Sequence, residues 1–243
     1  MVAEVFYLQS YLDHVFDHTW SLAIEEHFYI GLALVAFLFL LAKPKTMSRF
    51  VPLIITALLL LSFILRVLKS LPHKNEEFFP FFATHLRLDG ILTGALIAYL
   101  YYFTNHLQKI MQYRYWLFAA AALLVSPVFV YSGGSYIMNT YGITSMNLGF
   151  GIFVVLALDK GFLAGLPNVR FIKPLYYAIG LVGVHSYSVY LWHLFVKEQV
   201  LTLQLNYRMG LTVYVMLAIV VGVLLSIIIE KPFLMLRDKY FKS

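Results

Sequence analysis

Long apolar stretches separated by short charged segments restrict the fold of this chain more than any other feature. Stretches such as 20–42, 50–68 and 209–229 approach or exceed the roughly 20 residues that an α-helix needs to cross the hydrocarbon of a bilayer. Hydrophobic residues make up 61% of the 243 residues and charged residues 12%, whereas soluble domains contain about 25% charged residues. The sequence therefore predicts an all-α integral membrane protein whose chain crosses the bilayer several times.

Seven transmembrane helices are predicted. They cover residues 20–42, 50–68, 86–103, 115–131, 145–158, 184–203 and 209–229. The fifth helix is short because Gly149 and Gly151 interrupt it, and Pro127 is expected to kink the fourth. Residues 159–183 are basic and broken by prolines, which favours a loop with a short amphipathic helix lying in the interface.

Small residues recur every four positions in the third helix, at Gly90, Gly94 and Ala98. This spacing places them on one face, where they are expected to let a neighbouring backbone approach closely. The last helix is expected to end at Glu230-Lys231-Pro232, where Glu230 and Lys231 are interpreted as an ion pair at the helix end.

Basic residues are distributed unequally between loops on alternate sides. One side holds twelve, namely Lys43, Lys45, Arg49, Lys109, Arg114, Lys160, Arg170, Lys173, Lys231, Arg237, Lys239 and Lys242. The other holds six, namely Arg66, Lys69, Lys74, Arg87, Lys197 and Arg208. The positive-inside rule then places the C-terminus in the cytoplasm and the N-terminus outside, which suggests that an odd number of helices precedes Met1.

The net charge of +6 is scattered between the helices and forms no basic stripe, so a nucleic-acid partner is not expected. The chain has no cysteine, which excludes disulfides and thiolate metal sites, and no metal site is predicted.

Ionisable residues lie where the first apolar stretch begins. Glu25 lies roughly 7 Å below the outer surface at 1.5 Å per residue, and Ser21 and Tyr29 lie on about the same face. Carboxylates inside a membrane helix usually face a bundle interior or a wet cavity. Alternatively, Glu25 and Glu26 only interact with the positive N-terminal end of the helix dipole, an interpretation that we prefer for Glu26.

A second polar stripe follows the sixth helix, at Ser186, Tyr190, His193 and Lys197, whose spacings of four, three and four place them on one face. His193 lies near the middle of the predicted span. It is either a proton carrier or a hydrogen-bonding group that joins two helices.

Arg87 and Asp89 open the third helix at the predicted depth of Glu25. They either join a charge network with Glu25 or form a separate pair at the interface.

Several of these motifs resemble the acyltransferase 3 family of multi-pass membrane enzymes. Residues 18–29, HTWSLAIEEHFY, are similar to its HTWSLxxEEQFY signature, with His27 at the usual Gln. Residues 186–193 resemble its SYSxYLWH, residues 87–95 its RxDGLLxGAL, and residues 230–232 its closing ExP. The motifs follow the family's order and cover nearly the whole chain.

The resemblance implies about ten helices and transfer of an acyl group from acyl-CoA, here acetyl-CoA, to a hydroxyl of a bacterial surface glycan. Three helices before Met1, one of them with the Arg and the acting His of the family, would complete the ten. It further implies location in the bacterial plasma membrane, with membrane lipids, the acyl-CoA donor and a carbohydrate or glycolipid acceptor as partners. No tightly bound cofactor is expected.

The predicted site residues are therefore catalytic Glu25, His18 and His193, with Trp20, Ser21, Tyr29, Arg87, Asp89 and Tyr190 as substrate-binding residues. Arg114, Arg170 and Lys173 are weaker candidates for binding the CoA phosphates, because the positive-inside rule explains their charges equally well. Two alternatives remain: a transporter or flippase, whose proton relay uses similar residues, and a non-catalytic membrane scaffold.

Overall fold

The computed structural model describes residues 2–12, 18–41, 50–73, 82–159 and 172–241, and these are helical or lie in turns between helices. The chain divides into two compact units, Met1–Gly165 and Leu166–Ser243.

Five helical segments in the described residues are long and apolar enough to cross a membrane: Trp20–Leu38, Val51–Ser70, His106–Val130, Met138–Leu158 and Tyr207–Tyr240. A sixth is possible if a bent pair of helices forms one span. The prediction of a helical multi-pass membrane protein is thus confirmed, whereas the count of seven and the sidedness stay predictions.

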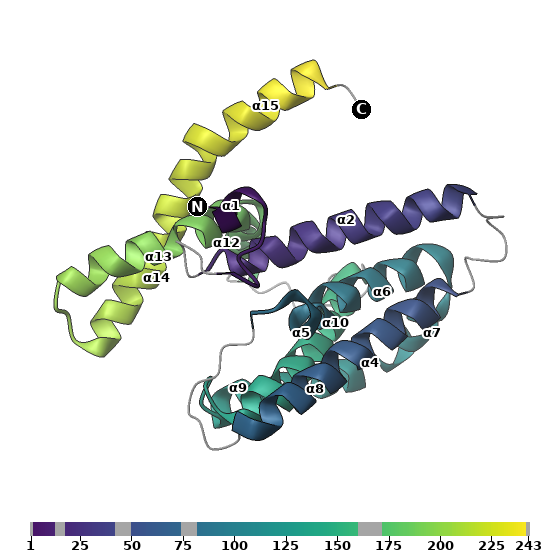
Figure 1. Ribbon diagram of the computed structural model, residues 1–243. Coiled ribbons are helices and arrows are strands. Elements are labelled where there is room, and N and C mark those ends of the chain that lie inside the picture. The colour runs from purple at the N-terminus through teal and green to yellow at the C-terminus, as the bar shows by residue number, and fades with distance from the viewer. Residues whose placement is uncertain (1, 13–17, 42–49, 74–81, 160–171, 242–243) are drawn as a thin grey trace. The chain divides into compact units, whose positions relative to one another are not determined.

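The helices of the N-terminal unit are, in chain order, α1 (Val2–Val5), α2 (Trp20–Leu41), α4 (Val51–Ser70), η1 (Leu71–His73), α5 (Thr84–Arg87), α6 (Asp89–Phe103), α7 (His106–Ile110), η2 (Met111–Tyr113), α8 (Arg114–Val125), α9 (Pro127–Val130), η3 (Met138–Gly142) and α10 (Ile143–Leu158). Helix α10 packs against both α6 and α8, and α4 packs against α6 (Figure 1). The interruption predicted at Pro127 is present, because α8 ends at Val125 and α9 begins at Pro127.

The predicted fifth helix is longer than its pattern indicated. A π-helical turn, η3, leads directly into α10, so the helical segment begins at Met138 rather than near Ser145. Gly149 and Gly151 do not weaken this helix but let it approach its neighbours. A Cβ atom at Gly149 would lie 2.7 Å from Val125 Cγ2, and one at Gly151 would lie 2.9 Å from Thr93 Cγ2.

The glycine stripe of the third predicted helix behaves differently. A Cβ at Gly94 would meet no atom within 4 Å, while one at Gly90 would lie 3.4 Å from the Asn147 side chain. The close backbone approach expected at Gly94 is therefore wrong, and the small residues of α10 provide the close contact with α6 instead. The third helix itself comprises α5 and the 15-residue α6, which meet at Leu88.

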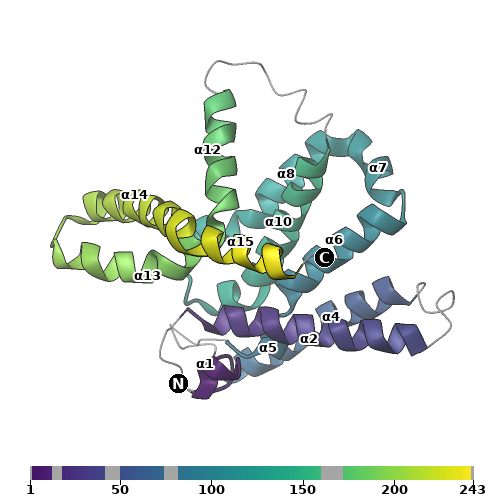
Figure 2. The ribbon, with the colours of Figure 1, turned by 90° about the horizontal axis from the view of Figure 1, so that it is seen from above.

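The C-terminal unit contains α12 (Ile172–Val184), α13 (Ser186–Thr202), α14 (Tyr207–Leu225), η4 (Ser226–Glu230) and α15 (Lys231–Tyr240). Segments Tyr177–Val184 and Ser186–Thr202 meet at an angle of 79° (Figure 2). The interfacial helix expected within 159–183 falls partly on residues 160–171, outside the described residues.

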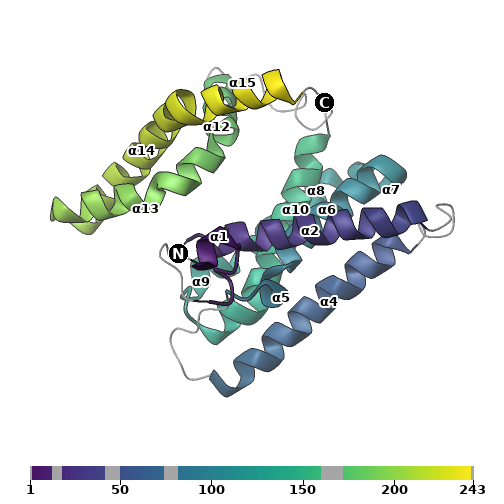
Figure 3. The same cartoon turned by 45° about the horizontal axis from the view of Figure 1, so that its top comes forward.

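The last helix does not end at Pro232 as predicted, because α14, η4 and α15 follow one another without a break (Figure 3). Proline removes an N–H donor and clashes with the preceding turn of an α-helix. Here a π-helical turn directly precedes α15, and Pro232 lies in the first turn of that helix, where its missing N–H is tolerated.

Helices α13 and α14 pack closely around Val196, Val200 and Ala218. The approach is tightest at Gly222, where a Cβ would lie 2.5 Å from Val189 Cα.

Candidate functional site

A cavity of about 250 Å³ lies between three parts of the N-terminal unit. Its walls come from the start of α2, the junction of α5 and α6, and α10. The lining residues are Trp20, Ser21, Ile24, Glu25, Arg87, Asp89, Gly90, Ile91, Ile143 and Asn147. The structure thus brings together five of the predicted site residues from positions more than 60 apart in the sequence.

Aromatic contacts position the cation of this cavity. The Arg87 guanidinium lies over the Trp20 ring, 5.2 Å from its centroid, and Phe82 packs against the same indole at 5.1 Å. A guanidinium over an indole face is held by the ring quadrupole. Trp20 therefore helps to hold Arg87 in place. The sequence had predicted Trp20 only as a substrate-binding residue.

Asp89 is held by a buried arginine from another helix. Nη2 of Arg66, on α4, donates to Asp89 Oδ2 at 2.7 Å and also to Thr144 Oγ1. Thr144 in turn donates to Asp89 Oδ2 at 3.2 Å. The pair is almost completely buried, with Arg66 at 0% and Asp89 at 2% exposure. A buried charge needs such a partner, because removing it from water without one is very costly.

From the sequence, Arg66 was one of six basic residues on one side, and Asp89 was expected to join Arg87 and Glu25 or to pair with Arg87 alone. The structure adds a partner that neither interpretation included, because Arg66 forms the buried ion pair with Asp89. An arginine within a predicted apolar helix is itself a signal of a functional or structural partner. Arg66 lies inside the apolar stretch 50–68, so the sequence already indicated that it needs a partner.

A hydrogen-bonded chain fixes the start of α2 against α5. His27 Nδ1 lies 2.8 Å from Thr84 Oγ1, which lies 2.9 Å from Ser10 Oγ. Thr84 and Ser10 are both buried. The contact joins the part of α2 that carries Glu25 to α5, the helix that carries Arg87.

The other predicted residues lie elsewhere. Glu25 lines the cavity with an exposed side chain, while Tyr29, one turn further along α2, is exposed and packs beside Phe28. His18 lies just before α2, where its carbonyl accepts a hydrogen bond from Ser21 Oγ at 3.3 Å.

Tyr190 and His193 belong to the C-terminal unit. His193 Nδ1 lies 2.5 Å from the Tyr190 carbonyl oxygen, and the two rings are 5.4 Å apart. Of the candidates for phosphate binding, Arg170 lies outside the described residues.

A second polar cluster lies within the C-terminal unit, where the buried His185, Ser188 and Ser226 meet the partly exposed Glu230. Ser226 Oγ donates to Glu230 Oε2 at 2.8 Å, and Ser188 Oγ donates to the same oxygen at 2.6 Å. His185 Nδ1 lies 2.8 Å from Ser226 Oγ and must donate, because the serine proton is already directed to Glu230. Glu230, predicted to pair with Lys231, is thus a hydrogen-bond acceptor where α14 passes into α15.

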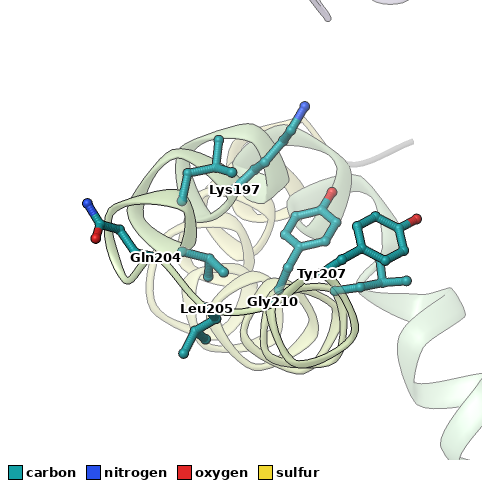
Figure 4. A pocket seen from close by; sticks show the side chains of 9 residues that line it. Lys197, Gln204, Leu205, Tyr207 and Gly210 are labelled. Atoms are coloured by element: carbon teal, nitrogen blue, oxygen red, sulfur yellow. The ribbon is translucent and has the colours of Figure 1, made fainter.

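The C-terminal unit also contains a larger and mostly apolar cavity of about 470 Å³ near the connection between α13 and α14. Figure 4 shows Lys197, Gln204, Leu205, Tyr207 and Gly210 at its wall. Of the predicted stripe on the sixth helix, Lys197 lines it, while neither Tyr190 nor His193 does.

The long apolar helices are those of a multi-pass membrane protein, and the cavity lined by Glu25, Arg87 and Asp89 is a polar site in its N-terminal unit. Comparison with known proteins then identifies its relatives. Over 253 residues the chain is 25% identical to the O-acetyltransferase OatA of Staphylococcus aureus strain NCTC 8325, an alignment that covers 98% of the chain. It is likewise 25% identical over 249 residues to a putative O-acetyltransferase of S. aureus strain COL, with 95% of the chain covered.

The chain is therefore a distant homologue of bacterial membrane O-acetyltransferases, and the resemblance to the acyltransferase 3 family is confirmed. It spans 38% of the length of these relatives. No profile of a known protein family matches the chain, and no solved structure matches it.

Proposed function

We propose that this chain forms part of a membrane O-acyltransferase. The enzyme moves an acyl group, acetyl by analogy with the relatives, from acyl-CoA to a hydroxyl of a surface carbohydrate or lipid-linked sugar. The observation that carries the proposal is the alignment of 98% of the chain with an O-acetyltransferase. The cavity that joins Glu25, Arg87 and Asp89 supports it, because acyl transfer needs both a proton acceptor and a stabilised oxyanion.

In the proposed reaction the hydroxyl oxygen of the acceptor attacks the thioester carbonyl carbon. A base takes the hydroxyl proton, the carbonyl oxygen becomes an oxyanion, and the C–S bond then breaks to release the CoA thiolate, which takes up a proton. The products are an O-acyl ester and CoA.

Two residues of the cavity have proposed roles in this reaction. Glu25 accepts the hydroxyl proton or orients a histidine that does so, as general bases commonly do. Arg87, held by Trp20, donates N–H groups to the developing oxyanion. His18, just before α2, stays a proposed catalytic residue, and Tyr190 and His193 stay proposed site residues of the C-terminal unit.

The test is acyl transfer by the full-length protein reconstituted in vesicles with radiolabelled acetyl-CoA and a membrane glycan acceptor. Replacing Glu25 by Gln keeps the size of the side chain but removes the base, and is expected to lower kcat by about 10²- to 10⁴-fold. Glu198→Gln is the matched control, because Glu198 is an exposed glutamate of α13.

Equal activity of the Glu25→Gln and Glu198→Gln variants would contradict the role of Glu25. If His193→Ala also left transfer intact, the whole site assignment would fail.

A transporter or flippase remains the second candidate, favoured by the 79° break between the segments on either side of His185. Discontinuous membrane helices often form the binding sites of transporters. Movement of the glycan across the vesicle membrane without covalent change would support this alternative, and neither activity would support a scaffold.

A further inference from the structure

The apolar cavity at the turn between α13 and α14 is built from both helices and from the residues that connect them. Its lining residues are Lys197, Val200, Leu201, Gln204, Leu205, Tyr207, Gly210, Leu211 and Tyr214. The volume of about 470 Å³ falls within the roughly 300–1,000 Å³ of pockets that enclose small ligands. None of these residues has a part in the proposed acyl transfer, so the cavity is large enough for a ligand that the reaction does not use.

Two backbone features border this space. Gln204 has a φ of 48°, in the left-handed region, and this conformation turns the chain out of α13. Gly210, near the start of α14, has no side chain, and a Cβ atom there would lie 3.9 Å from Leu205 Cβ, which is an ordinary van der Waals contact. A larger side chain at position 210 would therefore fit beside Leu205 and fill part of the cavity.

Apolar and aromatic side chains form most of the wall. Val200 and Leu201 come from α13, and Leu211 comes from α14. Tyr207 and Tyr214 are seven residues apart, about two turns, and so lie on the same face of α14. Tyr207 is 83% exposed at the beginning of a candidate membrane span, and tyrosine is enriched where a span meets water. The wall therefore suits a hydrocarbon chain whose polar end lies near the end of the span.

Lys197 supplies the charge of the cavity. It alone is charged among the nine lining residues, and it is exposed (Figure 4). No carboxylate among the residues that the structure describes forms an ion pair with it. Glu198 is the next residue but lies about 100° further round the helix and does not line the cavity. A lysine beside apolar surface in a membrane pairs with a counter-charge or extends toward the headgroups, and a lipid phosphate satisfies both conditions.

We propose that this cavity binds an anionic phospholipid of the bilayer. The lipid phosphate pairs with the Lys197 ammonium, and one acyl chain lies against the apolar wall. Arg208, directly after Tyr207, adds a second exposed cation at the same end of the helix pair, where Glu198 is the one acidic residue between positions 186 and 214. The excess of positive charge favours an anionic lipid over a zwitterionic one. This binding site goes beyond the proposed acyl transfer and does not depend on it.

The experiment is photo-crosslinking of the full-length protein in phosphatidylcholine nanodiscs. The probe is phosphatidylglycerol with a diazirine in one acyl chain, and peptide mass spectrometry locates the attached lipid. Attachment is expected within residues 197–214. Unlabelled phosphatidylglycerol should compete about fivefold better than phosphatidylcholine with the same chains, because Lys197 attracts its net negative charge. Glycerol 3-phosphate has a phosphate but no chain and should not compete.

Substitutions test the two halves of the site separately. Lys197→Gln removes the charge and should lower attachment about fivefold, while Lys197→Arg should retain it. Lys69→Gln is the matched control, at an exposed lysine in the last turn of α4. Gly210→Leu fills part of the cavity and should lower attachment about fivefold or more. Gly31→Leu is its control, at an exposed glycine of α2 where a Cβ would meet no atom within 4 Å.

Equal competition by phosphatidylcholine and phosphatidylglycerol would overturn the proposal, because the contact would then be that of any bilayer lipid. Failure of the probe to attach within residues 197–214 would overturn it as well, and so would attachment that survives either Lys197→Gln or Gly210→Leu. Competition by glycerol 3-phosphate would indicate a site for free phosphate instead of a lipid. None of these measurements depends on acyl transfer, so the proposed function can fail while the lipid site stands.

Discussion

Replacing Arg66 by Met tests the buried ion pair that holds Asp89. The substitution leaves a carboxylate that is 2% exposed without the cation that bonds it at 2.7 Å. Breaking a buried pair by removal of one partner typically costs about 3–5 kcal/mol, because the remaining charge is buried without compensation. A loss of about 4 kcal/mol corresponds to a roughly thousandfold smaller folding equilibrium constant.

The structure also supplies two comparisons for this variant. Arg237→Met breaks an ion pair of similar length, 2.8 Å, between side chains that are 62% and 66% exposed. Exposed pairs of this kind contribute about 0–1 kcal/mol. The double variant Arg66→Met/Asp89→Leu removes both buried charges and should recover most of the lost stability, since apolar replacements of buried pairs are often neutral or stabilising.

Equilibrium unfolding in mixed detergent and SDS micelles, followed by far-ultraviolet circular dichroism, measures these differences. The reasoning would be refuted if Arg66→Met were no less stable than Arg237→Met. It would also be refuted if the double variant were as unstable as Arg66→Met alone, because the cost would then not arise from the unpaired Asp89.

Two further predictions use the same unfolding assay. Gly222→Ala should cost about 1–3 kcal/mol, because the new Cβ would lie 2.5 Å from the Cα of Val189; Gly94→Ala, where nothing lies within 4 Å, should instead gain up to about 1 kcal/mol of helix propensity. Equal effects at the two glycines would show that helix packing does not decide the difference. Glu230→Leu should cost about 1–3 kcal/mol for each of the two buried serine hydroxyls that lose their acceptor. Glu230→Gln keeps an acceptor oxygen and should cost less, so a Gln variant as unstable as the Leu variant would contradict the assigned hydrogen bonds.

The local pattern predicted the helices well where hydrophobicity alone decides them. The span of α13, Ser186–Thr202, differs from the predicted 184–203 by only a few residues. Predictions from glycine and proline were less reliable, because these residues change which backbone conformations are allowed but do not decide whether the helix breaks, continues or packs closely at that position. Pro232 was expected to end a helix that in fact continues, and Gly149 was interpreted as an interruption although it provides a close helix contact.

The candidate site was partly predictable for a similar reason. Glu25, Arg87 and Asp89 stood out because each is an ionisable group at an apolar helix, where burial requires a partner. Their common cavity agrees with that argument. The identity of the partner was not accessible, because Arg66 is 23 residues from Asp89 and joins it only after α4 packs against α6.

The sequence by itself determined the membrane environment, the helical class, the acyltransferase resemblance and the residues that need compensation for their charge. These properties follow from composition and from spacing along single helices, where neighbours in sequence are neighbours in space. Only the tertiary structure decided which charges meet, that Trp20 holds Arg87, and that Ser188 and Ser226 share the Glu230 carboxylate. Such pairings depend on how separate helices rotate and approach one another. Close contacts at Gly149, Gly151 and Gly222 set this approach, and the periodicity within a single helix carries no information about it.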